Sequence, residues 1–196
     1  MINGEAMPAG RQGKYIYGII KTNQKREFGP IGIGARGDVV YTLCYQDLAA
    51  IVSSSPIVKY PVTRDNAIVH TQVLEKAMEE YTVLPARFCT IGEEEEVIIE
   101  KVLKSRYQEF IDLITEMEGK IELGVRMFWT DMKAIFNETV EENLPIKQLK
   151  DKLTKENEKE FDQKMQELEK VYGERKKLKY IGPVPPYNFV EVVVTW

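Results

Sequence analysis

The chain has 196 residues, of which 43% are hydrophobic and 30% are charged, a balance typical of a globular protein with a packed core. Its formal net charge of -4 argues against nucleic acid as the main partner, because phosphate backbones are bound by basic surfaces. No apolar run approaches the ~18 residues of a membrane-spanning helix, and residues 1–13 lack the apolar stretch of a signal peptide. We therefore expect a cytoplasmic protein with a flexible leader over residues 1–13.

The first half of the chain alternates strand and helix signals. Residues 15–20 are aromatic and β-branched, which favours a strand, and a glycine-rich loop follows over residues 29–37. Two short strands, 38–45 and 48–53, flank Gln46-Asp47 and predict a hairpin. Apolar residues then recur at three- and four-residue steps, which predicts a helix over residues 65–81.

Pro85 breaks the pattern after this helix, and the Thr90-x-x-Glu93 spacing has the form of a capping box. The capping box predicts a second helix from Glu93 to Met117, with a bend near Ser105. Strict alternation of apolar residues from Ile121 to Trp129 then predicts the clearest strand of the chain.

The second half is more charged. Residues 131–142 have a helical pattern, and residues 147–177 carry sparse apolar positions at helical steps, which fits a partner-facing helix and a solvated helix equally well. A proline-rich loop over 182–186 precedes a predicted terminal strand, residues 189–196. We expect this strand to join a sheet that the helical segment covers, since a lone strand needs a partner.

These elements predict an α+β protein of two domains, each with a mixed or antiparallel sheet covered by helices. The expected boundaries are residues 1–13 for the leader, 14–130 for the N-terminal α+β domain and 131–196 for the C-terminal α+β domain. A ferredoxin-like arrangement is one option for the second domain.

One glycine motif and one charged run invite a functional interpretation. Residues 32–37 match G-x-G-x-x-G, but a dinucleotide site needs a strand directly before the motif and a helix opening within it, and neither is predicted here. A tightly turning surface loop is the better interpretation. The run Glu93 to Glu96 is predicted to start a helix, where consecutive side chains diverge and cannot converge on one cation.

Single side chains give no catalytic constellation either. His70 is the only histidine and lies on the apolar face of its helix, so we expect a packed or hydrogen-bonded residue and not a general base. Cys89 is expected to be a buried small residue although Arg87 is near, and Cys44 falls within a strand. Two cysteines and one histidine cannot form a structural zinc site of the usual kind. We therefore expect no enzyme, no catalytic residue, no cofactor and no metal.

Four sequence blocks resemble the gas vesicle protein family labelled L/F. They are Tyr15-Ile16-Tyr17-Gly18-Ile19, the stretch from His70 to Leu84-Pro85-Ala86-Arg87-Phe88, Gly119 to Val125, and Gly182-Pro183-Val184-Pro185-Pro186-Tyr187-Asn188-Phe189. The blocks occur in the family's order and span nearly the whole chain. Cys89 stands where the family commonly has glycine, and Val184 where it commonly has tryptophan.

The resemblance also indicates a missing stretch. The family usually carries an additional alanine-rich segment and strand that we do not find between Asn143 and Phe161. Either residues are missing from the sequence there or the stretch is truly deleted, and an intact mass measurement decides between these alternatives.

The resemblance implies an accessory protein needed for gas vesicle formation, associated with the vesicle and in contact with the small hydrophobic shell protein and other accessory proteins. Strand addition at a sheet edge is a plausible mode of binding, with residues 15–20 and 190–196 as candidate edges. The alternative is a ferredoxin-like regulatory module that binds a small molecule or nucleotide. Neither a nucleic acid nor a lipid membrane is expected as partner, and no binding residue is assigned.

Overall fold

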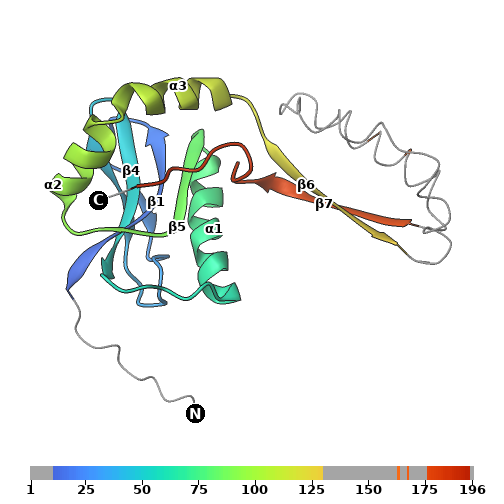
Figure 1. The fold of residues 1–196 in the computed structure, drawn as a ribbon, viewed down its shortest axis with the longest axis horizontal. Helices are drawn as coiled ribbons and strands as arrows, with labels where there is room; N and C mark the ends of the chain where they lie inside the picture. Colours follow the sequence, from blue (N-terminus) through green and yellow to red (C-terminus); the bar gives the residue numbers. More distant parts are fainter. Residues whose placement is uncertain (1–10, 130–162, 164–166, 168–175, 195–196) are drawn as a thin grey trace, which may run out of the picture. The chain divides into compact units, whose positions relative to one another are not determined.

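The computed structural model describes residues 11–129, 163, 167 and 176–194. Along the chain these residues form β1 (Gln12–Lys21), β2 (Glu27–Gly29), β3 (Val40–Tyr45), β4 (Leu48–Pro56), α1 (Arg64–Met78), β5 (Val83–Gly92), α2 (Glu95–Ile98), the π-helix η1 (Ile99–Lys104), α3 (Tyr107–Met117), β6 (Glu122–Trp129) and β7 (Lys176–Val184) (Figure 1). The predicted helices over 131–142 and 147–177 lie mostly outside the described residues.

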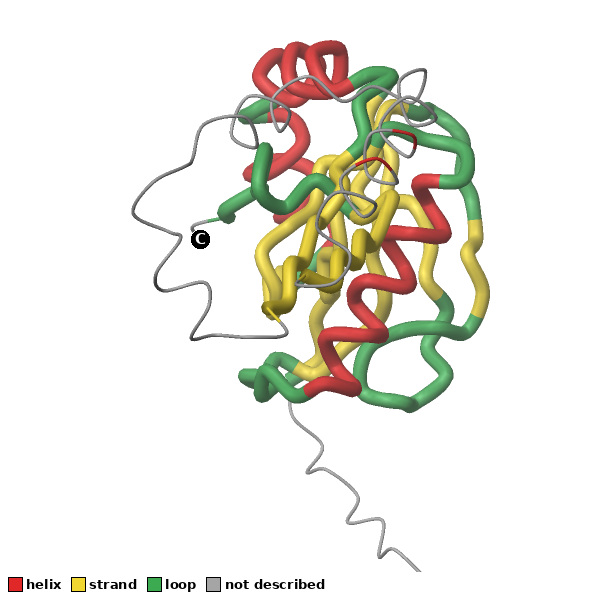
Figure 2. The backbone as a smooth tube through the Cα atoms, turned by 90° about the vertical axis from the view of Figure 1, so that its right-hand side faces the viewer, coloured by secondary structure: helices red, strands yellow, loops and turns green. Residues whose placement is uncertain are grey.

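A five-stranded antiparallel sheet in the order β2-β3-β4-β1-β5 forms the centre of the larger unit. Helix α1 covers one face of this sheet, in front of the strands in Figure 2, and α2, η1 and α3 cover the other face. The predicted α+β class is confirmed. Helices packed over both faces bury both sides of the sheet, which explains why β1 and β4 are buried almost throughout.

Strand β1 is the central strand and changes its alternation once. Its register with β4 and β5 shifts between Ile16 and Gly18, so Tyr17 is inserted as a bulge. Tyr15, Tyr17 and Ile20 therefore face α1, whereas Ile16 and Ile19 face the other helical layer. The interpretation of residues 15–20 as a free edge for strand addition is wrong, because β4 and β5 occupy both sides of β1.

The helix signals were largely correct, with one exception at a cap. Thr63 caps α1 by accepting a hydrogen bond from the Asn66 N–H, and the predicted bend near Ser105 is confirmed by the break between η1 and α3. The capping box of Thr90 and Glu93 is wrong. Thr90 lies within β5 and its hydroxyl donates to the Arg87 carbonyl, while Glu94 is the N-cap residue of α2 and makes no side-chain capping hydrogen bond.

The chain forms two compact units, one of Met1–Glu118 with Pro185–Trp196 and a second of Gly119–Val184. In the second unit β6 and β7 form a two-stranded antiparallel sheet. The strand predicted for residues 121–129 is confirmed, but it pairs with β7 instead of closing the first sheet. The predicted domain boundaries remain predictions, and the two described strands leave the ferredoxin-like option untested.

The predicted terminal strand also finds a different partner. Residues 185–194 belong to the larger unit, where Val192 makes an isolated parallel bridge with Ala86 of β5. This segment, which we call the C-terminal segment, joins the edge of the five-stranded sheet and not a separate sheet of the second half. Among the described residues no helix is long and apolar enough to cross a bilayer.

Candidate functional site

Strand β5 carries an outward loop at the sequence Ala86-Arg87-Phe88-Cys89. Gly18 of β1 pairs with Pro85 and Ile16 pairs with Thr90, so residues 86–89 of β5 have no partner on β1. Cys89 adopts φ +65°, a left-handed conformation that favours glycine. Pro85 and this irregular register hid the strand from sequence reasoning, which interpreted the stretch as a break.

A buried tyrosine connects this loop to α1. The Cys89 N–H donates to the Tyr15 hydroxyl at 2.9 Å, and the same hydroxyl lies 3.0 Å from Nδ1 of His70. Because the hydroxyl oxygen accepts from the Cys89 N–H, its own proton is donated to Nδ1, and we assign the single ring proton of the neutral imidazole to Nε2. Burial raises the pKa of Tyr15 well above its usual value, so the hydroxyl stays protonated.

His70 is 3% exposed, and burial lowers its pKa to about 4. The Ala86 carbonyl offsets part of this shift, but it makes no well-aligned hydrogen bond, and Nε2 has no hydrogen-bond partner among the described residues. The predicted packed, hydrogen-bonded histidine is thus confirmed. The imidazole is buried and hydrogen-bonded to a protonated phenol, so it is shielded from solvent.

Aromatic rings surround His70. The ring centroids of Tyr15, Tyr17 and Phe88 each lie 5.7 Å from the centroid of the imidazole. The rings of Tyr15 and Phe88 also contact each other, with their centroids 6.3 Å apart. Tyr187 of the C-terminal segment stacks on His70 at 6.3 Å with an interplanar angle of 26°. Such contacts add specific geometry to the burial of the rings. Tyr187 thereby brings the C-terminal segment into contact with His70 of α1.

The backbone of the C-terminal segment is held at the loop of β5. The Val192 N–H donates to the Pro85 carbonyl at 2.8 Å, and the Arg87 N–H donates to the Val192 carbonyl at 3.0 Å. Arg87 also pairs with Glu191, and Arg106 donates to the Val193 carbonyl at 2.9 Å. Val192 is 1% exposed and packs in the cluster on the α2–α3 side. Val192 thus belongs to the core layer on the α2–α3 side, while Tyr187 contacts His70 of α1.

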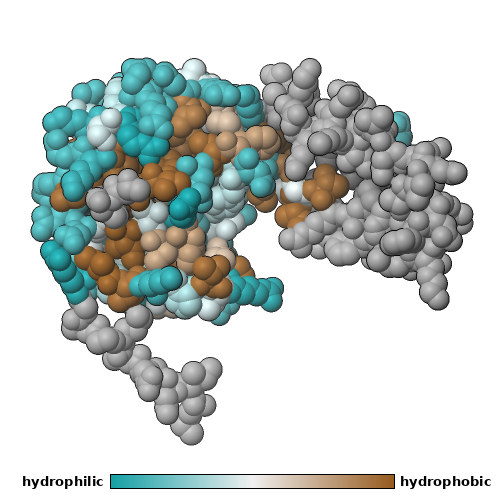
Figure 3. Space-filling view, in the orientation of Figure 1, coloured by the Kyte–Doolittle hydropathy of each residue, from teal (hydrophilic) through white to brown (hydrophobic). Residues whose placement is uncertain are grey.

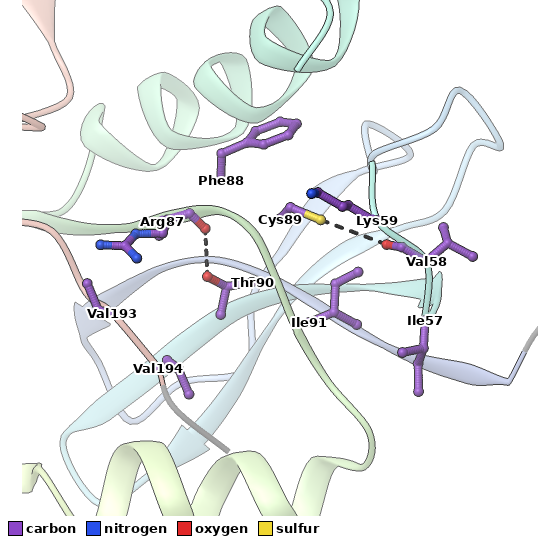
Figure 4. A pocket seen from close by; sticks show the side chains of 10 residues that line it. All are labelled: Ile57, Val58, Lys59, Arg87, Phe88, Cys89, Thr90, Ile91, Val193 and Val194. Atoms are coloured by element: carbon purple, nitrogen blue, oxygen red, sulfur yellow. Dashed lines mark hydrogen bonds between the residues drawn. The ribbon is translucent and has the colours of Figure 1, made fainter. Parts of the chain in front are cut away.

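A hollow of about 450 Å³ lies beside this junction (Figure 4). Its lining residues are Ile57, Val58, Lys59, Arg87, Phe88, Cys89, Thr90, Ile91, Val193 and Val194. They come from the segment that follows β4, from β5 and from the C-terminal segment. Cys89 lines the hollow, and its predicted burial is only partial. Its Sγ accepts from the Tyr60 N–H at 3.3 Å.

The remaining sequence candidates do not join this site. The loop at residues 32–37 turns through left-handed positions at Gly34, Ala35 and Gly37 and leads into β3, so the helix that a dinucleotide site needs is missing there. Ile33 in this loop is buried and donates its N–H to Tyr17 at 2.7 Å. Cys44 lies in β3 and its thiol donates to the Gln24 carbonyl.

The glutamate run diverges as expected. Glu93 pairs with Arg11, whereas Glu95 pairs with Lys14 and accepts the Tyr41 hydroxyl at 2.6 Å. The part of the chain that the structure describes holds no group of three or more His, Cys, Asp or Glu side chains that could bind a metal ion.

Comparison with known proteins gives the family. The profile described as "Gas vesicle synthesis protein GvpL/GvpF" matches residues 13–159 and 153–191. Gas vesicle protein F1 of Halobacterium salinarum is 28% identical over 202 residues, which cover 91% of this chain and 92% of that protein. Gas vesicle protein F of Nostoc sp. is 27% identical over 143 residues, but there the match spans 72% of this chain and only 57% of the relative.

Solved structures share the fold. The crystal structure of GvpF from Anabaena sp. PCC7120 aligns with a TM-score of 0.71 at 21% identity and covers 93% of this chain and 100% of its own. GvpF from Microcystis aeruginosa aligns with a TM-score of 0.67 at 20% identity and covers 90% of this chain and 98% of its own. At this identity the likeness concerns the fold alone.

Proposed function

Because the chain belongs to the gas vesicle synthesis protein family GvpL/GvpF, we propose that it is a non-catalytic accessory protein of gas vesicle assembly that binds the small hydrophobic shell protein and other accessory proteins. The observation that carries this proposal is the family match over residues 13–159 and 153–191. We further propose that it works in the cytoplasm, in association with the growing vesicle.

A binding role has a physical reason. A shell subunit that will face gas exposes apolar surface during assembly, and exposed apolar surface in water leads to aggregation unless a partner covers it. The hollow beside β5 offers apolar side chains such as Ile57, Ile91 and Val194 for that purpose. His70 is enclosed and neutral, which supports a role in packing and not in catalysis.

Binding of the purified full chain to the purified shell protein tests the proposal. We expect saturable capture of the shell protein on the immobilised chain at micromolar concentrations. An unrelated acidic protein of similar size, immobilised at the same density, is the control for adsorption of a hydrophobic ligand. Absence of binding, or equal capture by the control protein, would contradict the shell-protein part of the proposal and leave the other accessory proteins as candidate partners.

A further inference from the structure

The C-terminal segment leaves the edge of β5 after one bridge, at Val192 and Ala86. Beyond that bridge the register fixes which main-chain groups are free. The Ile57 N–H donates to the Arg11 carbonyl. At the start of β1 the main-chain N–H and C=O groups of odd-numbered residues therefore point toward β4, and those of even-numbered residues point toward β5. Lys14 and Ile16 pair with Gly92 and Thr90 of β5.

The main-chain N–H and C=O of Ile91 therefore point away from β1, toward the open side of the sheet. In the described part of the chain neither group has a recorded hydrogen-bond partner. An unpaired N–H and C=O on an edge strand are the groups through which another extended segment pairs.

The hollow lies beside β5, with Ile57 and Val58 on one side and Val193 and Val194 on the other (Figure 4). A strand added at the open edge of β5 would run through it. Its lining joins the two core layers. Val58, Phe88, Cys89 and Ile91 pack against the cluster on the α1 side, and Val194 packs against the cluster on the α2–α3 side. Figure 3 shows hydrophobic side chains exposed on the face over which the C-terminal segment runs in Figure 1. We call this hollow, with the free edge of Ile91, the β5 slot.

The charges that line the β5 slot are positive. Arg87 is already paired with Glu191 at 3.1 Å. Lys59 makes no ion pair within the described residues, so it is the uncommitted charge of the lining. An acidic group on an occupant would complement it, and this favours an apolar strand with an acidic residue over a purely apolar one.

We propose that the β5 slot binds an extended, apolar segment of a partner protein, which adds to β5 as a strand and places an acidic residue against Lys59. This inference deepens the proposed function, since the shell protein would supply the segment. Main-chain hydrogen bonds to Ile91 give affinity, and apolar side chains on alternate positions enter the hollow between the two helical layers.

The two cysteines of the unmodified chain report on occupancy. Cys89 lines the slot, whereas Cys44 lies in β3, separated from β5 in the sheet by β4 and β1. The probe is a ten-residue peptide in which valine alternates with threonine and which ends in two glutamates. At a concentration of about ten times its Kd, we expect iodoacetamide to alkylate Cys89 about tenfold more slowly, with the rate at Cys44 unchanged.

A charge exchange tests the orientation and needs no assumption about folding. Lys59→Glu should weaken the glutamate peptide at least about tenfold, and a peptide ending in two lysines should bind this variant better than it binds the unmodified chain. Lys21→Glu is the matched control, because Lys21 is exposed and ends β1 opposite Leu48, far along the strand from Lys14 and Gly92. It should leave peptide binding unchanged.

The outcomes separate the slot from the proposed function. Protection of Cys89 by both the peptide and the shell protein supports both inferences. Protection by the peptide without any shell-protein binding supports the slot and overturns the shell protein as its occupant. Shell-protein binding that leaves Cys89 unprotected overturns the slot and leaves the proposed function standing. Equal protection of Cys44 and Cys89, or protection by a helix-forming peptide only, overturns strand addition at β5.

Discussion

Gly18 lies at a crowded point of β1, next to the bulge at Tyr17. A Cβ atom there would lie 2.7 Å from the Leu84 carbonyl oxygen and 3.0 Å from a methyl group of Leu74. Because the first neighbour is backbone of a paired strand, we expect Gly18→Ala to lower the free energy of unfolding by about 1–3 kcal/mol. Urea unfolding measures the change. Gly124→Ala is the control, since its new Cβ would meet only the Ile181 oxygen at 3.5 Å; equal losses would contradict the steric argument.

Cys89 pays a conformational cost that its sequence context does not reveal. A left-handed backbone costs an L-residue with a Cβ about 1–2 kcal/mol relative to glycine, and the φ of Cys89 is +65°. We expect Cys89→Gly to be more stable than Cys89→Ala by about 1 kcal/mol, because both variants lose the thiol and differ only in the Cβ. Thermal and urea unfolding of the pair measure this difference. A more stable alanine variant would show that the loop of β5 relaxes to another conformation.

The left-handed backbone at position 89 could have been predicted from the sequence. The resemblance already placed Cys89 where the family commonly has glycine, and an expected glycine is a signal for a left-handed residue. The hydrogen bond between Tyr15 and His70 could not have been predicted from the sequence, because it joins residues 55 positions apart and depends on how β1 packs against α1.

His70 makes stability depend on pH. Its pKa is about 4 in the folded chain against 6.5 for the free side chain, so the folded state disfavours the proton. The contribution is fully present above pH 6.5 and is lost as the pH falls toward 4, by an amount that corresponds to about 3 kcal/mol. We expect His70→Phe, which keeps an aromatic ring, to lose less stability between pH 7 and pH 4.5 than the unmodified chain. Identical pH profiles by urea unfolding would show that folding does not lower the pKa of His70.

The junction between β5 and the C-terminal segment depends on main-chain groups, so proline substitutions can test it. Val192→Pro removes the N–H that donates to Pro85 and leaves that carbonyl unpaired, which should cost about 2 kcal/mol and expose the segment to protease. Val193→Pro is the control, because its N–H donates to no carbonyl among the described residues and Val193 is 38% exposed. Limited proteolysis should cut the first variant faster than the second; equal rates would mean that the bridge does not hold the segment.

Elements with a regular period were predictable from sequence, and irregular ones were not. The spacing of His70, Leu74 and its neighbours predicted α1, and the alternation from Ile121 to Trp129 predicted β6. β5 was missed because Pro85 and the residues around the loop interrupt any alternation. β7 was missed because the charges of the preceding run extend into Lys176–Val184. Which strands pair was harder still to predict, because the register between β6 and β7 is set by residues far apart in the chain.

The larger unit is discontinuous in sequence, which a linear scan for boundaries does not detect. A composition change near residue 130 predicted one boundary, which remains a prediction, and the contacts group Pro185–Trp196 with Met1–Glu118. The C-terminal segment supplies Val192 to one core layer and Tyr187 to the ring stack on His70. A fragment that ends at residue 118 would lose both contacts while keeping all five strands of the sheet.

This arrangement predicts complementation between two pieces of the chain. A fragment of residues 11–118 should unfold at a lower temperature than a mixture of the same fragment with a peptide of residues 185–194, because a ligand that binds only the folded state stabilises it. The melting temperature should rise with peptide concentration. The free energy of unfolding should increase by about 2.7 kcal/mol when the peptide is at 100 times its Kd. A peptide with Val192→Pro is the control and should stabilise the fragment far less, since it cannot donate to Pro85. If neither peptide raises the melting temperature, the C-terminal segment is not part of the cooperative unit, and the core formed by residues 11–118 is sufficient by itself.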